Sequence, residues 1–382
     1  MTRVLLIGTV ESKTAEIDCL AAALARHGLE REVIDISLGS GGAILTGSEK
    51  IARMGEVAAA AAKIVNARSA GAAAVIGLGG GTGGELVLGA MKSLPATFPK
   101  VLITPLAFDP REALADTAIT LVPTLCDLEG LNPMLRQVFE NTAAMVAGLI
   151  RAAQVAENER PNVAVTTLGA TGAAGAAVTR ELGAKGIDAT VFHANGYGGA
   201  AFARFLAEGG AAGVIDLNVH ELGRIRLAGA HAPMPGRFRA GDAIPRVVLP
   251  GGLNFIGLGA LSALPEAYRA RAHYQHSNHF THVVLSEAEM ADQAAALAAE
   301  LNHATAPCHV AIPMGGFSHE DRPGGAIEAP VLREIAADVL ERDARAFSVE
   351  KLPHHINTDE TAKAAVAALL ERMPDAGHRP LS

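Results

Sequence analysis

The sequence predicts an α/β protein that consists of two tandem Rossmann-like domains with mainly parallel sheets. Strand-like apolar runs alternate with amphipathic helical patterns from the first residues onward, as in β-α-β units. The polar stretch ENERPN, around residue 158, interrupts this alternation, and the pattern then repeats. With 382 residues, of which 49% are hydrophobic, the chain is long enough to form two ordinary cores.

The first domain is expected to span residues 1–158, with strands and helices in regular alternation. Each expected strand is a short run rich in Val, Ile and Leu, and each helix carries apolar residues three or four positions apart. Gly28 is expected to end the first helix, because glycine is favoured just after a helix terminus. The expected strands are residues 3–9, 31–37, 72–78, 100–106 and 117–123, and the main helices are residues 15–28, 49–71 and 131–153.

The second domain, residues 159–382, repeats the first, which indicates an internal duplication. Val163 aligns with Val4, and Gly186 aligns with Gly28, with a single-residue gap between the two matches. The later strand pairs are residues 74–78 with 213–217 and 99–104 with 245–250, and two more strands are expected at 309–314 and 346–352.

Composition excludes several function classes. The net charge is −8 and no run of Lys or Arg forms a basic stripe, so no nucleic-acid partner is expected. The 3 cysteines lie far apart and outside any CxxC pattern, which fits a reducing cytoplasm and suggests neither a disulfide framework nor a thiolate zinc site. The first apolar run is too short for a signal peptide, and no long apolar segment follows it, so we expect a soluble cytoplasmic protein without a membrane partner.

A glycine-rich loop is expected between a strand and a helix of the first domain, where open parallel sheets bind ligands. Its backbone N–H groups and the helix terminus favour a phosphate, with a positive φ at Gly81 or Gly83 and a hydroxyl donor from Thr82. The loop is not a P-loop, because no Lys follows its last glycine. Close packing of the helix on the strand is the alternative reason for so many glycines. The expected phosphate-binding residues are Gly79, Gly80, Gly81, Thr82, Gly83 and Gly84.

Two other strand-to-helix loops are expected to meet the same ligand. In GTVESK, Lys13 is suited to a phosphate and Glu11 to a metal or a ribose, with Thr9 beside them; a solvated turn is the alternative. The corresponding loop of the second domain, at Thr171 and Gly172, is also expected to receive phosphates.

Two further loops of the second domain carry candidate ligand or catalytic residues. His193 ends an expected strand, and Asn195, Gly196 and Gly198 follow it as ligand-binding candidates. After the next strand, a carboxylate and imidazole group suits acid/base chemistry or metal binding. The catalytic candidates are His193, Asp216, His220 and Glu221.

The run HYQHSNHFTH places His273, His276, His279 and His282 at intervals of three. On a helix this spacing would stack the imidazoles and could bind a transition metal. Ser, Asn and Thr between them are poor helix residues, and no HExxH-like pattern is present, so we expect a polar loop with one or two functional residues. No metal ligand set is assigned. GGFSHEDRPGG brings His319 to a further strand end.

Six of these loops, in order across the chain, resemble uncharacterised protein family 0261, which contains the N-terminal ATP-binding domain of the tomato mosaic virus resistance protein. The motifs are GTVESKTAE, GLGGGTGG, FHANGYGG, VIDLNVHEL, PRVVLPGGLNF and PHHIN. The resemblance implies two Rossmann-like subdomains, ATP with magnesium near the glycine loops, and a homodimer. Glu11 and Ser12 replace the family's aspartate and threonine, and Val284 stands where an arginine is usual, which implies a retained nucleotide side and an altered second site.

The first hypothesis is therefore an ATP-binding protein with a ligand cleft between its two domains. If it is an enzyme, small organic-acid or carbohydrate metabolism is the expected field, and its partners are a nucleotide and an unknown small molecule. Two alternatives remain: a non-enzymatic module that nucleotide binding stabilises for a partner, and a sugar-phosphate-binding enzyme without nucleotide.

Overall fold

The computed structural model describes residues 2–39, 45–151, 160–228, 234 and 236–373. The chain divides into two compact units, unit 1 (Met1–Ala156) and unit 2 (Glu157–Ser382), each with its own sheet and core. Among the described helices, none combines the length and apolarity needed to cross a bilayer.

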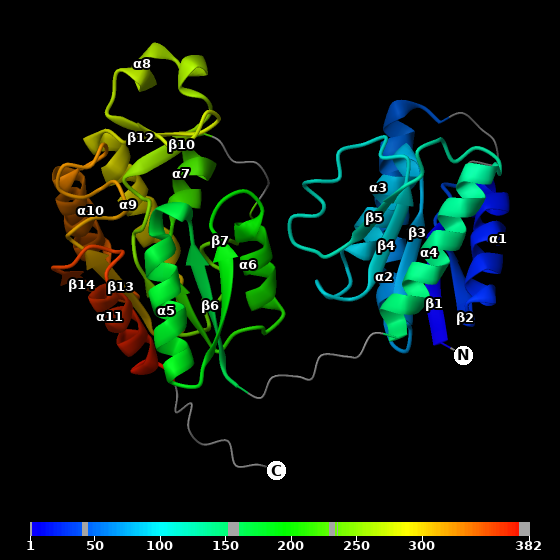
Figure 1. Cartoon of the computed structure of the whole chain (residues 1–382), viewed down its shortest axis with the longest axis horizontal. Helices are drawn as coiled ribbons and strands as arrows, with labels where there is room; N and C mark the ends of the chain where they lie inside the picture. Colours follow the sequence, from blue (N-terminus) through cyan, green and yellow to red (C-terminus); the bar gives the residue numbers. More distant parts are fainter. Residues whose placement is uncertain (1, 40–44, 152–159, 229–233, 235, 374–382) are drawn as a thin grey trace, which may run out of the picture. The chain divides into compact units, whose positions relative to one another are not determined.

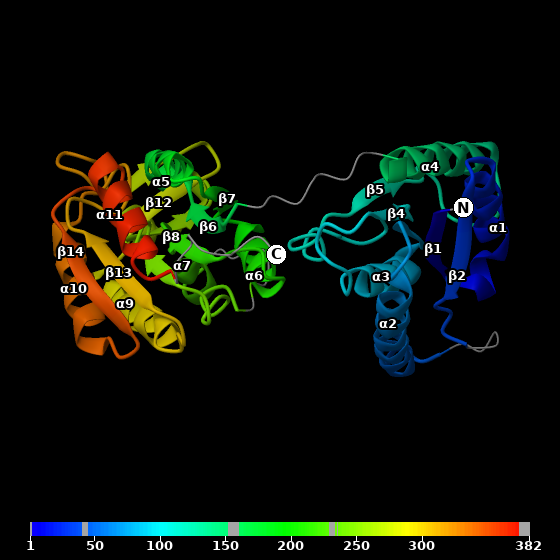
Figure 2. The ribbon, with the colours of Figure 1, turned by 90° about the horizontal axis from the view of Figure 1, so that it is seen from below.

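Unit 1 is a parallel five-stranded sheet in the order β2-β1-β3-β4-β5, with helices on both faces. Alternate side chains of β1 enter two cores: Val4 and Leu6 pack beneath α1 and α4, and Leu5 and Ile7 beneath α2 and α3. Figures 1 and 2 show these helix pairs on opposite faces. The elements are β1 Thr2–Gly8, α1 Val10–Arg26, β2 Leu29–Asp35, α2 Gly47–Ser69, β3 Ala74–Leu78, α3 Gly81–Met91, β4 Lys100–Thr104, β5 Thr120–Pro123 and α4 Pro133–Arg151.

Unit 2 is built on a parallel six-stranded sheet in the order β14-β13-β9-β8-β6-β7. Helices α5 and α11 pack on one face of this sheet, and α9 and α10 pack against each other in the large core on the other. The elements are β6 Asn162–Thr167, α5 Gly172–Ala184, β7 Asp188–His193, α6 Gly198–Ala207, β8 Gly213–Asp216, α7 His220–Arg226, β9 Arg246–Val248, α9 Glu287–Leu301, β13 Cys308–Pro313, α10 Pro330–Asp343, β14 Phe347–Leu352 and α11 Asp359–Leu370.

Strand register confirms the internal duplication. Val4 of β1 pairs with Ala74, and Val163 of β6 pairs with Gly213, the residue that the alignment sets against Ala74. The first helix of unit 1, α1, and the first helix of unit 2, α5, also end in the same way. Gly28 and Gly186 follow them with φ of 75° and 73°, a conformation that glycine adopts at little cost.

A small antiparallel sheet, β10-β12-β11, is inserted between β9 and β13 of unit 2. The expectation of a polar loop for the histidine run is wrong at both ends of the run, because residues 273–275 form β11 and residues 281 and 282 belong to β12, whereas residues 276–280 connect the two strands. The strands are too short to show a clear two-residue period in the sequence. The insertion consists of β10 Phe255–Leu258, the 3₁₀ turn η2 Leu261–Ala263, α8 Glu266–Arg269, β11 His273–Gln275 and β12 Thr281–Val284.

Candidate functional sites

The strand order of unit 1 reverses between β1 and β3. At such a position the loops that follow the two strands leave toward opposite faces of the sheet, and the gap between them is where open α/β sheets bind ligands. The loop after β1 contains Thr9, and the loop after β3 leads into α3. The two loops are close: a Cβ built on Gly83 lies 3.6 Å from Cγ2 of Thr9.

The glycines of this loop have two different environments. A Cβ on Gly79 would lie 2.5 Å from the carbonyl carbon of Gly83, and a Cβ on Gly84 would overlap the ring of Phe108. These two glycines are required for packing. A Cβ on Gly80 meets no atom within 4 Å, and one on Gly81 meets only Ala107, at 3.9 Å. The open glycines therefore border free space at the amino end of α3.

The expected positive φ in this loop is wrong. None of the residues Gly79 to Gly84 has a positive φ, because α3 begins at Gly81 and the following residues continue the helix. Backbone N–H groups of a first helical turn lack an acceptor four residues earlier. Gly81, Thr82 and Gly83 therefore present their N–H groups as helix N-terminal donors rather than as a left-handed loop.

The start of α1 is held by the end of β2. Oδ1 of Asp35 accepts hydrogen bonds from the N–H of Val10 at 3.1 Å and the hydroxyl of Ser37 at 2.6 Å. Burial is the largest single effect and raises the pKa of Asp35, but the hydrogen bonds from Ser37 and Val10 together outweigh it and lower the pKa below the ordinary value. Lys13 interrupts the helix, with φ −132° and ψ 27°, so the first turn of α1 is separate from the rest.

In unit 2 the equivalent reversal of strand order lies between β6 and β8. Polar groups in the loops at this position are hydrogen-bonded to other residues of the chain. The Thr171 hydroxyl is fully buried and accepts from the N–H of Leu168 and from Nδ2 of Asn218. The N–H of Ala174 in the first turn of α5, which starts at Gly172, donates to Oδ1 of Asn357. A phosphate at this helix terminus would have to displace that cap.

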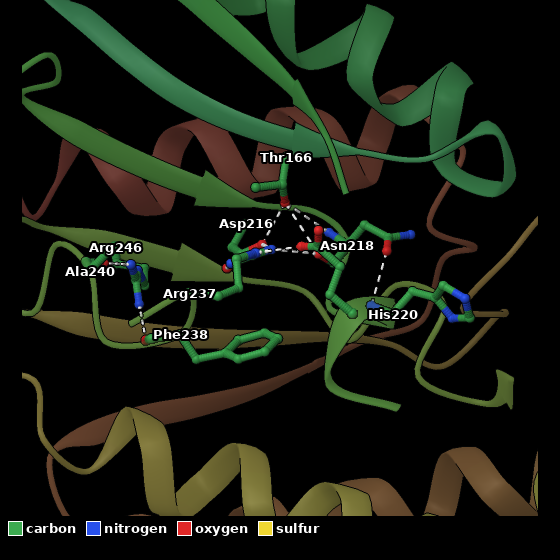
Figure 3. A network of polar contacts seen from close by, with 9 residues as sticks. Thr166, Asp216, Asn218, His220, Arg237, Phe238, Ala240 and Arg246 are labelled. Carbon is green, nitrogen blue, oxygen red and sulfur yellow. Dashed lines mark hydrogen bonds and ion pairs between the residues drawn. The ribbon is translucent and has the colours of Figure 1, made fainter. Parts of the chain in front are cut away.

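Asp216 and Glu221 are brought together by Arg237, which the sequence did not single out. The Arg237 guanidinium is completely buried and donates to both Asp216 oxygens at 2.9 Å (Figure 3). It also donates to Oε2 of Glu221 at 2.6 Å. The Thr166 hydroxyl donates to Oδ1 of Asp216 at 2.5 Å. Both oxygens of Asp216 are therefore engaged, which favours a role in positioning the loop rather than in proton transfer.

The two carboxylates of this network differ in their pKa shifts. Burial is the largest single effect and raises the pKa of Asp216, but the charges of Arg237 and Arg246 and the hydrogen bonds from Arg237 and Thr166 together outweigh it and leave the pKa below the ordinary value. Burial dominates at Glu221 and raises its pKa despite the same arginine. Oε1 of Glu221 lies 2.5 Å from the position of a Cβ on Gly199, so the amino end of α6 packs directly on this carboxyl group.

The residues expected after β7 differ in their exposure to solvent. His193 is exposed at the end of the edge strand, whereas Oδ1 of Asn195 is buried without a hydrogen-bond partner among the described residues. Gly196 has a φ of 67°, which makes it necessary for this turn, and α6 starts at Gly198. His193 is thus separated from the buried network of Asp216 and Glu221.

His220 lies in a contiguous set of six ring side chains, here named the ring cluster. Its imidazole is buried, with Nδ1 3.1 Å from the carbonyl oxygen of Gly252, and burial lowers its pKa to about 4. Centroid separations are 4.6 Å from His220 to Phe255, 4.2 Å from Phe255 to His282, and 5.2 Å from His282 to His276. The ring cluster consists of His220, Phe255, Tyr274, His276, His282 and His319.

The histidine run is divided between the two faces of the small sheet. Tyr274 pairs with His282 across β11 and β12, and both rings lie on the face of the ring cluster with His276. His273 pairs with Val283 on the opposite face, and His279 is exposed between the strands. In the part of the chain that the structure describes, no three His, Cys, Asp or Glu side chains are grouped to hold a metal.

Sequence reasoning missed three polar residues that the structure brings to these sites. Arg237 lies in a loop without periodicity, so nothing in the sequence linked it to Asp216. Ser318 and Asn254 are completely buried, and their side-chain polar atoms have no hydrogen-bond partner among the described residues. Their positions just beyond β13 and just before β10 are the only sequence signal that points to them.

Comparison with known proteins gives consistent matches along both units. Residues 41–155 match the N-terminal domain, and residues 160–373 the C-terminal domain, of the uncharacterised protein family UPF0261. A UPF0261 protein of Mesorhizobium japonicum is 29% identical over 397 residues, covering 97% of this chain and 99% of the relative.

Tomato proteins match a large part of the chain. The ToMV resistance protein Tm-1 of Solanum lycopersicum is 32% identical over 320 residues, covering 80% of this chain but 42% of the tomato protein. The ToMV susceptible protein tm-1 matches equally well, at 32% over 319 residues. A solved glycosyltransferase, VinC in complex with dTDP, aligns at 12% identity with a TM-score of 0.19, which is too low to support an argument. From the family matches, which together span most of both units, the chain belongs to the uncharacterised protein family UPF0261.

Proposed function

We propose that unit 1 binds the phosphates of ATP, together with Mg²⁺, at the amino end of α3. The observation that carries this proposal is the open space over Gly80 and Gly81, next to Thr9 and at the reversal of strand order. The unpaired N–H groups of the first turn and the positive end of the helix dipole suit an anion of high charge. The helix has 11 residues, which is long enough for its dipole to favour an anion at the amino end.

The neighbouring loops supply groups for the rest of the nucleotide. Lys13 lies in the first turns of α1, the helix that follows β1, and β1 is the strand next to β3. The cation of Lys13 suits the phosphates. The bonds from Val10 and Ser37 all end on Oδ1 of Asp35, which leaves Oδ2 as an acceptor for a ribose hydroxyl. An acidic residue at the end of the second strand has this role in many dinucleotide-binding folds. Mg²⁺ in such sites is held mainly by the phosphates and water, so few protein carboxylates are needed.

Calorimetric titration of the full chain tests this function. We expect ATP with Mg²⁺ and ADP to bind, and ribose 5-phosphate to bind much more weakly, because a single phosphate uses fewer of the α3 donors. Equal affinity for ribose 5-phosphate and ATP would support the sugar-phosphate function instead, and no heat with any nucleotide would overturn the proposal. Product analysis in the same samples, with small organic acids added, separates an enzyme from a module that binds without turnover.

A further inference from the structure

His282 in unit 2 has a buried nitrogen with no hydrogen-bond partner among the described residues. The residue is 8% exposed, and Nδ1 of its imidazole is buried without a hydrogen-bond partner among the described residues. Buried polar atoms are nearly always paired in native proteins, so an unpaired one requires an explanation. The Nδ1 atom of His319 is also buried and unpaired among the described residues. Two imidazoles with unused nitrogens, both in the ring cluster, indicate a ligand that supplies the partners.

Tyr274 connects these two imidazoles. Its ring centroid is 5.9 Å from that of His282 and 5.2 Å from that of His319. The arrangement is fixed by backbone contacts from distant parts of the sequence: Tyr274 pairs with His282 in the small sheet, and the N–H of His319 donates to the carbonyl oxygen of Ala170. The two unpaired nitrogens thus belong to a preformed arrangement rather than to independent surface side chains.

The ring cluster stands at the carboxyl edge of the six-stranded sheet. His220 follows β8, His319 follows β13, and Ala170 follows β6. Open α/β sheets bind their ligands beyond this edge. Exposure also changes in order across the cluster: His276 is exposed, the His319 side chain is 31% exposed and His282 is buried. His319 is therefore accessible from solvent, and His282 lies deeper in the same cluster.

Charge near the cluster favours an anion. The described residues of unit 2 include four buried arginines and three buried carboxylates, so arginine is in excess by one, and the charge of Arg224 acts on both His220 and His282. Burial and then the positive potentials of His220, His276, His319 and Arg224 lower the pKa of His282 to about 3, so its ring is neutral at physiological pH. Oε1 of Glu320 lies 3.8 Å from Nε2 of His319. The buried arginines and carboxylates among the described residues of unit 2 are Asp216, Glu221, Asp321, Arg224, Arg237, Arg246 and Arg333.

We propose that unit 2 holds a second ligand site at the ring cluster, which binds a carboxylate or phosphate group of a small molecule through the imidazoles of His282 and His319. The site is separate from the nucleotide site proposed at α3. A neutral imidazole donates one N–H to an oxyanion without carrying a charge of its own, and Arg224, whose charge acts on His220 and His282, supplies attraction.

The test is a titration of the full-length protein followed by the imidazole ¹H–¹⁵N resonances. The probes are inorganic phosphate, malonate and ribose 5-phosphate, each added separately at constant pH and ionic strength. We expect at least one probe to shift the resonances of both His282 and His319 to saturation and to raise their pKa values. Response to malonate alone identifies a carboxylate site, and response to the two phosphates alone identifies a phosphate site.

Single substitutions assign the site. His282→Asn and His319→Asn are each expected to weaken probe binding about tenfold or more, as for the loss of one hydrogen bond to an anion. His279→Asn, at the exposed turn of the same hairpin, is the matched control and should bind normally, as should Gly81→Val in α3. A melting curve checks the fold of each variant. If His282→Asn does not fold, probe binding by His319→Asn and the wild-type resonances decide whether the anion binds at the ring cluster.

Three results would overturn this proposal. The first is that no probe shifts the resonances of His282 or His319. The second is that His279→Asn weakens binding as much as His319→Asn. The third is loss of probe binding in Gly81→Val, which would place the anion at α3.

Discussion

Arg246 holds in unit 2 the strand position that Lys100 holds in unit 1. Lys100 pairs with Val75, and Arg246 pairs with Val214, the residue that aligns with Val75 in the duplication. Both cations are nearly completely buried and donate to backbone carbonyl groups, Lys100 to Pro95 at 2.5 Å and Arg246 to Phe238 at 2.7 Å. The two units thus share a buried cation that secures the loop before a central strand.

Lys100→Met is expected to lower the free energy of unfolding of unit 1 by about 1–3 kcal/mol, because carbonyl groups are left without their donor. Lys50→Met, at an exposed position of α2, is the control and should change stability by at most about 0.5 kcal/mol. Urea denaturation followed by circular dichroism measures both. Equal stability of the two variants would show that water replaces the Lys100 ammonium at no cost.

Arg237→Met is expected to destabilise unit 2 by about 3–5 kcal/mol, because Asp216 and Glu221 would remain buried without their partner. Arg239→Met removes a nearby arginine whose side chain is 51% exposed, and should be nearly neutral. Denaturant titration at pH 7 compares the two. A stable Arg237→Met protein would indicate that the carboxyl groups are protonated in the fold or reach solvent.

Acid should destabilise unit 2 through its buried histidines. His282 and His220 have folded pKa values lowered to about 3 and about 4, below the unfolded value near 6.5, so the unfolded chain binds more protons between these limits. Stability is therefore complete above about pH 6.5 and falls as the pH decreases. At pH 5 each histidine contributes a loss of roughly 2 kcal/mol at most.

The variant His282→Asn isolates this effect. Between pH 7 and pH 5 it should lose less stability than the wild type, because one titrating imidazole is gone. His279→Asn, which replaces an exposed imidazole, should follow the wild type. Parallel loss in all three proteins would mean that His282 is protonated in the folded state at pH 5.

Gly79→Ala tests which glycines serve packing. The added Cβ would overlap the backbone of Gly83 and Gly84, so we expect a loss of about 1–3 kcal/mol or more. Gly80→Ala adds the same atom where no other lies within 4 Å, and its melting temperature should stay near that of the wild type. Identical melting of both variants would contradict the assigned close approach of strand and helix.

The fold could be predicted from the sequence because it depends on local periodicity and on repetition. The alternation of strands and helices, the aligned glycines Gly28 and Gly186, and the two β-α-β units are all visible along the chain. The ring cluster could not be predicted in the same way. Strands of three and four residues, β11 and β12, carry too few positions to show a period, so the face on which each histidine lies emerges only from the pairing of Tyr274 with His282.

The buried ion pairs could not be predicted from the sequence either, for a different reason. Asp216 was recognisable as a strand-end carboxylate, but its partner Arg237 lies 21 residues away in a loop without a pattern. Long-range pairing of charges depends on how the loops after β8 close over the sheet. The position of the glycine loop could be predicted from the sequence, but the helical φ values of its residues could not. These values depend on α3 beginning as early as Gly81.

The most direct test of the account is the ATP affinity of Gly81→Val, measured by calorimetric titration with Mg²⁺ beside a thermal melt without ligand. The valine side chain would fill the space over the first turn of α3, so we predict a loss of affinity on the order of a hundredfold, from a few hydrogen bonds to anions worth roughly 1.5–3 kcal/mol each. Gly148→Val, the same change at an exposed position of α4 with no atom within 4 Å, should bind ATP like the wild type. Unchanged ATP affinity in a folded Gly81→Val protein would contradict the account, because the open glycines would then serve only the packing of the helix on its sheet.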